Sequence, residues 1–394
     1  MGSTPPSQQQ HQPPSQSTSI ETKTQTFNAR CHCTSQPRIS FTVPTSDLPL
    51  PAYFCHCGVC RRTHGTLADN HVKAAEVTGV DVEDGEDEEG LKIRGMKAYR
   101  SSVGYFCQTC GAHVFDRTQG EIWYYISISS IDAPESVWDI HSHYHVGSIG
   151  DGGMANWIRS IDGRREVRAL QTQQQQRRQQ EQEGEEDKKH DFIKAQCHCK
   201  GVTFYILRPP PPSSSAEPKP DDDEDSMSIM PASLTPRDPT KWYALLDMCT
   251  TCSLVSACAV VAWCFPLASR ILIPAWRTWQ PLTSLFGTLK QYTSSNGIRR
   301  TFCGACGAVV SYECEDRAGI VDVAVGILRG EEEEEEWVGR DRRGKGKRDG
   351  ALALSWLEWR TGKVGFREDA IERGWGDLFG GLEEGLMAWG KKVG

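Results

Sequence analysis

The segment Phe106–Ala112 reads FCQTCGA, and Phe302–Ala308 reads FCGACGA. In both segments two cysteines stand two residues apart and a glycine follows the second. Glycine accepts the backbone conformations of a tight turn, and closely spaced cysteines are typical ligands of zinc. The two segments therefore predict a pair of metal-binding turns in one chain.

Other patterns recur around these segments in the same order, which indicates an internal repeat. Cys31–Cys33 (CHC) returns as Cys197–Cys199 (CHC), Cys57 and Cys60 return as Cys249 and Cys252, and Lys97–Ser102 (KAYRSS) returns as Lys290–Ser295 (KQYTSS). Chance patterns do not keep their order in this way. We therefore predict two related units.

Composition places the boundaries of these units. We predict a disordered tail rich in Gln, Ser and Pro at 1–26, a first domain at 27–164, a Gln- and Glu-rich linker at 165–191 and a second domain at 192–394. Proline-rich and acidic runs predict disordered insertions in the second domain near 209–240 and 330–350.

Secondary structure is predicted to be mainly β, with few short helices. Short β-branched or aromatic runs bounded by Gly, Pro or Asp read as strands; they are Ile39–Val43, Ile122–Ile128, Val202–Leu207, Val309–Tyr312 and Ile320–Val325. The apolar run Leu254–Ala268 is too short to cross a membrane and is predicted to be a buried strand pair. Gly374–Lys391 has helical spacing of its apolar residues.

The net charge of −8 argues against non-specific binding to nucleic acid or to an anionic membrane surface. The first residues carry neither the apolar core of a secretory signal nor the arginines of a transit peptide. We expect a cytoplasmic protein, with the nucleus as the other compartment. In such reducing compartments, close pairs among the sixteen cysteines bind metal or perform redox chemistry more often than they form disulfides.

A CxC pair and a later CxxC pair together supply four thiolates, which is the ligand set of a closed structural zinc site. The alternative is a redox pair, which would stand at the start of a helix after a strand. Strands are predicted after both CxxC pairs, so zinc is favoured. Cys55, Cys57 and Cys60 form a different group of three thiolates, the number that a catalytic zinc with an open position uses. His56 or His64 as a fourth ligand would instead make this site closed and inert, and spacing leaves both readings open.

In this order and twice over, CxC, CHCxxC and FCxxCG resemble the glutathione-dependent formaldehyde-activating enzyme (GFA) family, also called the centromere-protein-V (CENP-V) domain. The resemblance covers Thr26–Gly163 and Phe192–Lys392, and Ile320–Gly326 with Ser355–Trp359 resembles the ending of fungal members. It implies two zinc-stapled domains of Mss4-like (β-tent) fold. It also implies a carbon–sulfur lyase-type reaction that joins glutathione, as co-substrate, to formaldehyde or another small electrophile, as in an S-hydroxymethylglutathione synthase.

The resemblance also implies the roles of particular residues. The structural zinc ligands are Cys31, Cys33, Cys107 and Cys110 in the first unit and Cys197, Cys199, Cys303 and Cys306 in the second; Cys55, Cys57 and Cys60 are the catalytic ligands. Two zinc ions are expected in each unit. The second unit departs from the pattern because Asp247 replaces the first catalytic cysteine ahead of Cys249 and Cys252. Asp247, Cys249 and Cys252 remain candidate zinc ligands, because a carboxylate and two thiolates can form an open site. Cys258 is either a substitute ligand or a buried apolar residue. The second unit therefore has either an altered site or no catalysis, in which case it serves as a scaffold.

Several other residues are candidates because of their place in the chain. His64 is a candidate acid that protonates the developing alkoxide, and Arg61 and Arg62 are candidate groups for a glutathione carboxylate. His141, His143 and His145 alternate, which predicts one face of a strand, where we expect solvated imidazoles. Trp356 and Trp359 are expected in the core.

Two other functions fit the same pattern. One is a non-catalytic, zinc-stapled module that binds a protein partner, with no membrane and no direct nucleic-acid contact. The other is a zinc buffer or redox sensor that uses exposed thiolates.

Overall fold

The computed structural model describes residues 23–78, 82–87, 90–99, 104–117, 123–163, 165–170, 191–211, 227–273, 278–279, 285–329 and 350–393. Most of the expected tail, the centre of the expected linker, residues 212–226 of the first expected insertion and nearly all of the second lie outside the described residues. The part of the first insertion that is described is folded: residues 227–240 include two 3-10 turns, and Met230 and Leu234 are buried.

The protein is mainly β, as predicted from its short β-branched and aromatic runs. The first half contains β1 (Thr24–Ala29), β2 (Ile39–Pro44), β3 (Leu50–Cys55), β4 (Asp69–Ala74), β5 (Val82–Asp87), β6 (Gly90–Ile93), β7 (Met96–Tyr99), β8 (Gly104–Cys107), β9 (His113–Arg117), β10 (Tyr124–Ser127), β11 (Trp138–Tyr144), β12 (Ser160–Ile161), β13 (Arg165–Glu166) and β14 (Arg168–Ala169). The second half contains β15 (Phe192–Gln196), β16 (Thr203–Leu207), β17 (Trp242–Asp247), β18 (Val261–Cys264), β19 (Ile271–Ile273), β20 (Thr278–Trp279), β21 (Leu289–Ser295), β22 (Ile298–Cys303), β23 (Val309–Cys314), β24 (Asp322–Ala324), β25 (Leu328–Arg329) and β26 (Leu357–Trp359). The α-helices of the described residues are α1 (Gly58–His64), α3 (Thr250–Ser256), α4 (Arg367–Glu372) and α5 (Gly376–Val393).

The main sheets of the two halves have the same strand order. In the first half the order is β14-β11-β3-β4-β10-β9-β8-β7, and in the second half it is β26-β17-β18-β24-β23-β22-β21. Both sheets have a parallel pair at the equivalent place, β3 with β11 and β17 with β26, and β14 adds a second parallel pair with β11 at the edge of the first sheet. The ladders from β3 to β7 and from β17 to β21 are antiparallel. This equivalence is consistent with the repeat seen in the sequence.

The prediction of a strand pair over Leu254–Ala268 is wrong in its first part. The chain forms the short helix α3, leaves it through Ala257 in the left-handed conformation (φ 55°), and then enters β18. Both elements are buried almost completely, so the apolar run has no period that would separate helix from strand.

Helix α5 matches the helical prediction at the end of the chain. A residue of the first half caps the first turn of α5: the Glu135 carboxylate accepts hydrogen bonds from the backbone N–H groups of Asp377 and Leu378 at 2.6 and 2.8 Å. Trp356 and Trp359 are buried, as expected. No helix among the described residues is long and apolar enough to span a membrane.

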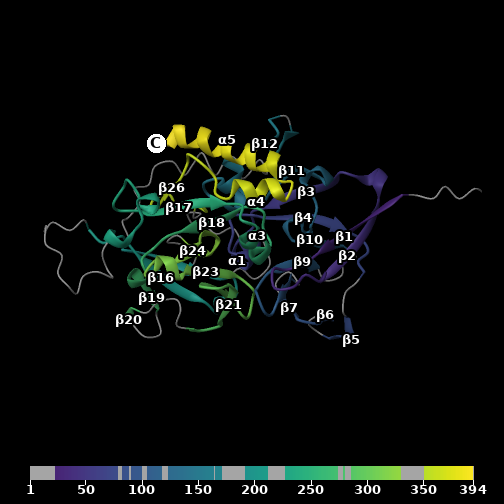
Figure 1. Ribbon diagram of the computed structural model, residues 1–394, viewed down its shortest axis with the longest axis horizontal. Helices are drawn as coiled ribbons and strands as arrows, with labels where there is room; N and C mark the ends of the chain where they lie inside the picture. The colour runs from purple at the N-terminus through teal and green to yellow at the C-terminus, as the bar shows by residue number, and fades with distance from the viewer. Residues whose placement is uncertain are drawn as a thin grey trace, which may run out of the picture.

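The two halves pack against each other through one continuous hydrophobic core, and α5 lies across one side of both (Figure 1). Two reciprocal hydrogen bonds join them: His32 Nδ1 lies 2.7 Å from the Tyr292 hydroxyl, and His198 Nδ1 lies 2.7 Å from the Tyr99 hydroxyl. Each histidine comes from a CHC motif and each tyrosine from the strand that pairs with β8 or β22. The contact surface is therefore close to two-fold symmetric within a single chain.

Candidate functional site

Two groups of four cysteines gather as the spacing predicted. One contains Cys31, Cys33, Cys107 and Cys110, and the other contains Cys197, Cys199, Cys303 and Cys306; within each group all Sγ atoms lie within 4.8 Å of one another. Neighbouring Sγ atoms are 3.4–3.5 Å apart in both. A tetrahedral zinc ion with Zn–S bonds of about 2.3 Å places its sulfurs about 3.8 Å apart, so both groups fit structural zinc.

Glycine closes each of the two CxxC turns. Gly111 and Gly307 have φ of 83° and 75°, a left-handed conformation that glycine adopts without strain. The turn in the second half also directs the backbone N–H groups of Ala305 and Cys306 at Cys303 Sγ, both at 3.4 Å. These donors stabilise a thiolate, the form in which cysteine binds metal.

The third group consists of Cys55 at the end of β3, Cys57 at the N-cap of α1 and Cys60 within α1. Their Sγ atoms also lie within 4.8 Å of one another, and among the described residues no fourth ligand joins them. His56 is fully buried and its Nε2 faces His143 Nδ1 at 2.8 Å. The arrangement matches the open three-ligand reading.

His64 does not join this group either, because both of its ring nitrogens face other protein atoms. Nδ1 lies 3.1 Å from the carbonyl oxygen of Cys60, which can only accept, and Nε2 lies 2.8 Å from Asp69 Oδ2. The ring is buried. This geometry argues against the role of acid expected for His64, since neither nitrogen is left to reach a substrate.

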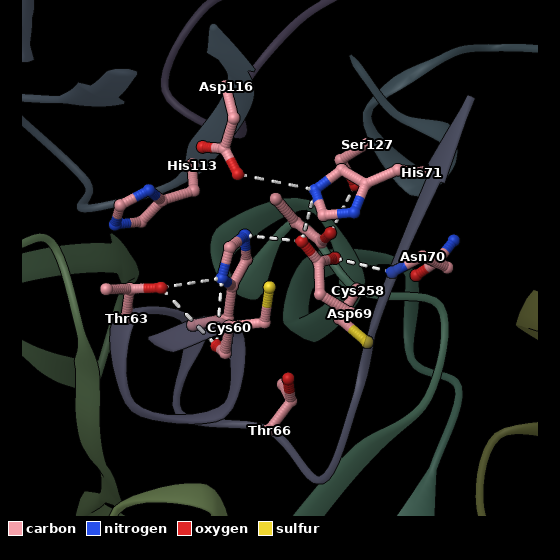
Figure 2. A network of polar contacts seen from close by, with 12 residues as sticks. Cys60, Thr63, Thr66, Asp69, Asn70, His71, His113, Asp116, Ser127 and Cys258 are labelled. Atoms are coloured by element: carbon pink, nitrogen blue, oxygen red, sulfur yellow. Dashed lines mark hydrogen bonds and ion pairs between the residues drawn. The ribbon is translucent and has the colours of Figure 1, made fainter. Parts of the chain in front are cut away.

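Asp69 is the centre of a buried polar network behind Cys60 (Figure 2). Its Oδ2 also lies 2.7 Å from His71 Nε2, which is 3.7 Å from Asp116 Oδ2, and its Oδ1 accepts the backbone N–H of Asn70 at 2.7 Å. The ligand atoms of His64, Asp69 and His71 are close enough to hold a metal, but the distances are also those of charge-assisted hydrogen bonds.

The pKa values of this network follow from opposing effects. Burial opposes protonation of His71, but the Asp69 carboxylate outweighs burial and raises the pKa of His71 to about 9. The same carboxylate raises the pKa of His64 against the effect of burial. Burial would raise the pKa of Asp69, yet the two imidazoles hold it well below its usual range. The contacts with Asp69 therefore favour the imidazolium form of both histidines and the charged form of the carboxylate.

Of the two arginines after the cluster, Arg62 is the better placed near the thiolates. Its guanidinium lies against Gly58, where a Cβ would meet Nη2 at 2.7 Å, and Gly58 directly follows Cys57. Arg61 is buried, and its Nε has no hydrogen-bond partner in the part of the chain that is described.

The equivalent place in the second half is built differently. In the described residues, Asp247, Cys249 and Cys252 do not bring three ligand atoms together as Cys55, Cys57 and Cys60 do. Burial, and then the charge of Cys249, raises the pKa of Asp247 to about 8, and its Oδ1 accepts the backbone N–H of Cys249. Instead of a third thiolate, Arg300 approaches Cys252, with Nη2 at 3.5 Å from Sγ. Cys258, the substitute considered from the sequence, is buried and donates to Ala68 O at 2.8 Å.

The prediction that three alternate histidines share one face of a strand is wrong. A bulge in β11 between Ile140 and Ser142 breaks the alternation, so His141 is exposed while His143 is buried against His56. His145 lies beyond the strand with φ of 60°. A bulge leaves no signature in residue types at this position.

Sequence reasoning missed Asp69, His71 and Asp116. They come from β4 and β9 and are joined to α1 only by the fold. The one available signal was the polar sequence Asp69–His71 within an otherwise strand-like segment.

The model of the glutathione-dependent formaldehyde-activating enzyme family matches residues 26–146. The matched segment contains the first four-cysteine group, the three-cysteine group and the Asp69 network. The first half of the chain therefore carries a GFA domain. Comparisons with curated proteins and with solved structures found no match.

Proposed function

We propose that the first half is a zinc-dependent enzyme that forms or cleaves the carbon–sulfur bond between glutathione, or a similar thiol, and formaldehyde or another small electrophile. The observation that carries this proposal is the group of three thiolates, Cys55, Cys57 and Cys60, inside the GFA domain. A three-thiolate set with no fourth ligand is the arrangement of catalytic rather than structural zinc. In this proposal Cys31, Cys33, Cys107 and Cys110 hold a structural zinc ion that staples the same domain.

A zinc ion held by the three thiolates would supply a Lewis acid that lowers the pKa of a thiol. In the synthetic direction, the glutathione sulfur forms a bond to the carbonyl carbon of formaldehyde, the π electrons move to oxygen, and the thiol proton ends on that oxygen through solvent. Arg62, beside Cys57, and Arg61 are the cations proposed to bind glutathione carboxylates. We assign His64 to positioning, because its hydrogen bonds tie Cys60 to Asp69.

We further propose that the second half is a diverged copy of the same domain, of CENP-V type like the first. It keeps the four-cysteine group, the strand order and the reciprocal histidine–tyrosine contacts. Asp247 replaces the third thiolate, and the described residues of the second half contain no group like His64, Asp69 and His71, so we assign catalysis to the first half alone. A reducing compartment, the cytoplasm or the nucleus, would keep all these thiols able to bind zinc.

The test compares wild type with Cys57→Ser, using zinc content, circular dichroism and the rate at which glutathione and formaldehyde equilibrate with S-hydroxymethylglutathione, followed by NMR exchange. The matched control is Cys314→Ser, because Cys314 is half-buried and belongs to none of the thiolate groups. We expect Cys57→Ser to stay folded, to lose one zinc equivalent and to fall to the spontaneous rate, while the control keeps the wild-type rate.

Unchanged exchange in folded Cys57→Ser would refute the proposed site. Exchange at the spontaneous rate in zinc-loaded wild type would refute catalysis of this reaction and would favour the non-catalytic, protein-binding reading.

A further inference from the structure

The second half keeps a pair of cysteines where the first half gathers three. Cys249 is the N-cap of α3 and is partly exposed, whereas Cys252 lies in the first turn of that helix and is buried. Cys249 and Cys252 are three residues apart at the start of one helix, a spacing that places two side chains next to each other on the helix surface. A pair with one accessible and one buried sulfur is the arrangement of a thiol that attacks and a thiol that resolves.

In the described residues this pair has no third ligand atom close enough to complete a metal site. Arg300 is buried, with 3% of the residue exposed, and its Nε donates a hydrogen bond to Ser294 Oγ at 3.0 Å. Its Nη2 lies 3.5 Å from Cys252 Sγ. The guanidinium donates to the reduced sulfur of Cys252, as the Arg38 guanidinium does to Cys31 and Cys107 at 3.5 and 3.6 Å in the first half. The missing third ligand, and not this cation, therefore separates the pair from a zinc site.

The position in the first half that is equivalent to Arg300 carries no charge. Arg300 pairs with Tyr292 in the β21–β22 ladder, and the equivalent partner of Tyr99 in the β7–β8 ladder is Gly104. Two residues therefore distinguish the second half from the first. Arg300 adds a cation beside the thiols, and Asp247 replaces the third thiolate.

We propose that Cys249 and Cys252 form a reversible disulfide in exchange with glutathione, and that this place in the second half is a redox site and not a zinc site. The Cys249 sulfur attacks one sulfur of glutathione disulfide and releases one glutathione thiol. Cys252 then attacks the mixed disulfide and releases the second. Two protons and two electrons pass from the cysteine pair to glutathione disulfide, which becomes two molecules of glutathione. This site is independent of catalysis in the first half.

The experiment equilibrates the zinc-loaded full chain with mixtures of glutathione and glutathione disulfide, blocks free thiols by alkylation under acid quench, and maps disulfides by mass spectrometry. Zinc content is measured on the same samples. The variants are Cys249→Ser and Cys252→Ser, and the matched control is Cys264→Ala, because Cys264 is a buried second-half cysteine outside every thiolate group.

We expect wild type and the control to form a Cys249–Cys252 disulfide in excess glutathione disulfide, with no loss of zinc, and to lose it in excess glutathione. Cys252→Ser should trap one glutathione on Cys249, and Cys249→Ser should leave Cys252 unmodified, each with the wild-type zinc content. Free Cys249 and Cys252 in wild type under excess glutathione disulfide would overturn the proposal. So would the loss of one zinc equivalent in folded Cys249→Ser, since that result assigns the pair to a metal.

Discussion

The substitution Asp69→Asn tests the reading of the buried network most directly. Asp69 is fully buried and its Oδ2 contacts His64 and His71 at 2.8 and 2.7 Å. Removing its charge takes away the carboxylate that contacts both buried imidazoles and leaves Asp116, 3.7 Å from His71 Nε2, as a more distant counter-ion. A rise in the pKa of His71 from 6.5 to about 9 corresponds to about 3 kcal/mol of folding free energy. The loss of one partner of a buried ion pair costs about 3–5 kcal/mol, which agrees.

The pH dependence of this loss has a definite sign. His71 has a higher pKa in the folded state than in the unfolded chain, so its contribution is fully present below the ordinary value of 6.5 and disappears as pH rises through about 9. Asp69 has a lowered pKa, so its own contribution is present above its ordinary value of 3.8 and is lost only in acid. The loss caused by Asp69→Asn should therefore be about 3 kcal/mol larger at pH 6 than at pH 9, because most of the His71 contribution has disappeared at pH 9.

Chemical denaturation of the zinc-loaded protein at the two pH values measures this difference between wild type and variant. Asp139→Asn is the matched control, because Asp139 faces His141 at 3.9 Å with nearly half of each side chain exposed, and such pairs contribute about 1 kcal/mol at most. Equal losses at pH 6 and pH 9, or a loss at pH 6 no larger than that of the control, would show that the network is not charged.

Two further predictions concern the turns and the contact between halves. Gly111→Ala should reduce the free energy of unfolding by about 2–4 kcal/mol in thermal or denaturant melts, because φ of Gly111 is 83° and the new Cβ would meet the Phe302 ring at 2.7 Å. The control Gly362→Ala has open space around the new Cβ and should change the free energy of unfolding by less than about 0.5 kcal/mol. Equal effects of the two substitutions would contradict the packing described. Tyr99→Phe should lower the free energy of unfolding by about 1 kcal/mol, because the hydrogen bond to His198 is lost, and should leave the zinc content unchanged. A loss of zinc would contradict the interpretation that this contact only joins the two halves.

The sequence predicted the parts of the fold that depend on short spacing. The CxC and CxxC pairs are local, and their repetition in order was enough to predict which four cysteines gather in each half. The strands were recognisable because their residues are β-branched or aromatic. The run at Leu254–Ala268 was misread because complete burial removes the contrast between a polar and an apolar face on which the distinction rests.

The site was less predictable because its polar groups meet only in three dimensions. Spacing grouped Cys55, Cys57 and Cys60 but gave no sign that His64 would face Asp69 instead of the thiolates. The contact between Arg300 and Cys252 could not be predicted for the same reason, because the two residues lie far apart in sequence and meet only in the folded chain. Residue types indicate which chemistry is available, but long-range partners determine which atoms remain free to perform it.

The contacts between the halves give the second half a role in the first site even without catalysis of its own. The segment from Gly65 to Asn70 connects the helix that carries Cys60 to the strand that carries Asp69. The second half holds it at three points: Gly65 O accepts the N–H of Gly326 at 3.2 Å, Ala68 O accepts from Cys258 Sγ at 2.8 Å, and Asn70 Oδ1 accepts the N–H of Ala259 at 3.0 Å. These bonds fix the distance between the thiolates and the network behind them. A second half without a third thiolate would thus still support the first site, because without it Gly65, Ala68 and Asn70 would lose the partners that hold the thiolates and the Asp69 network in place.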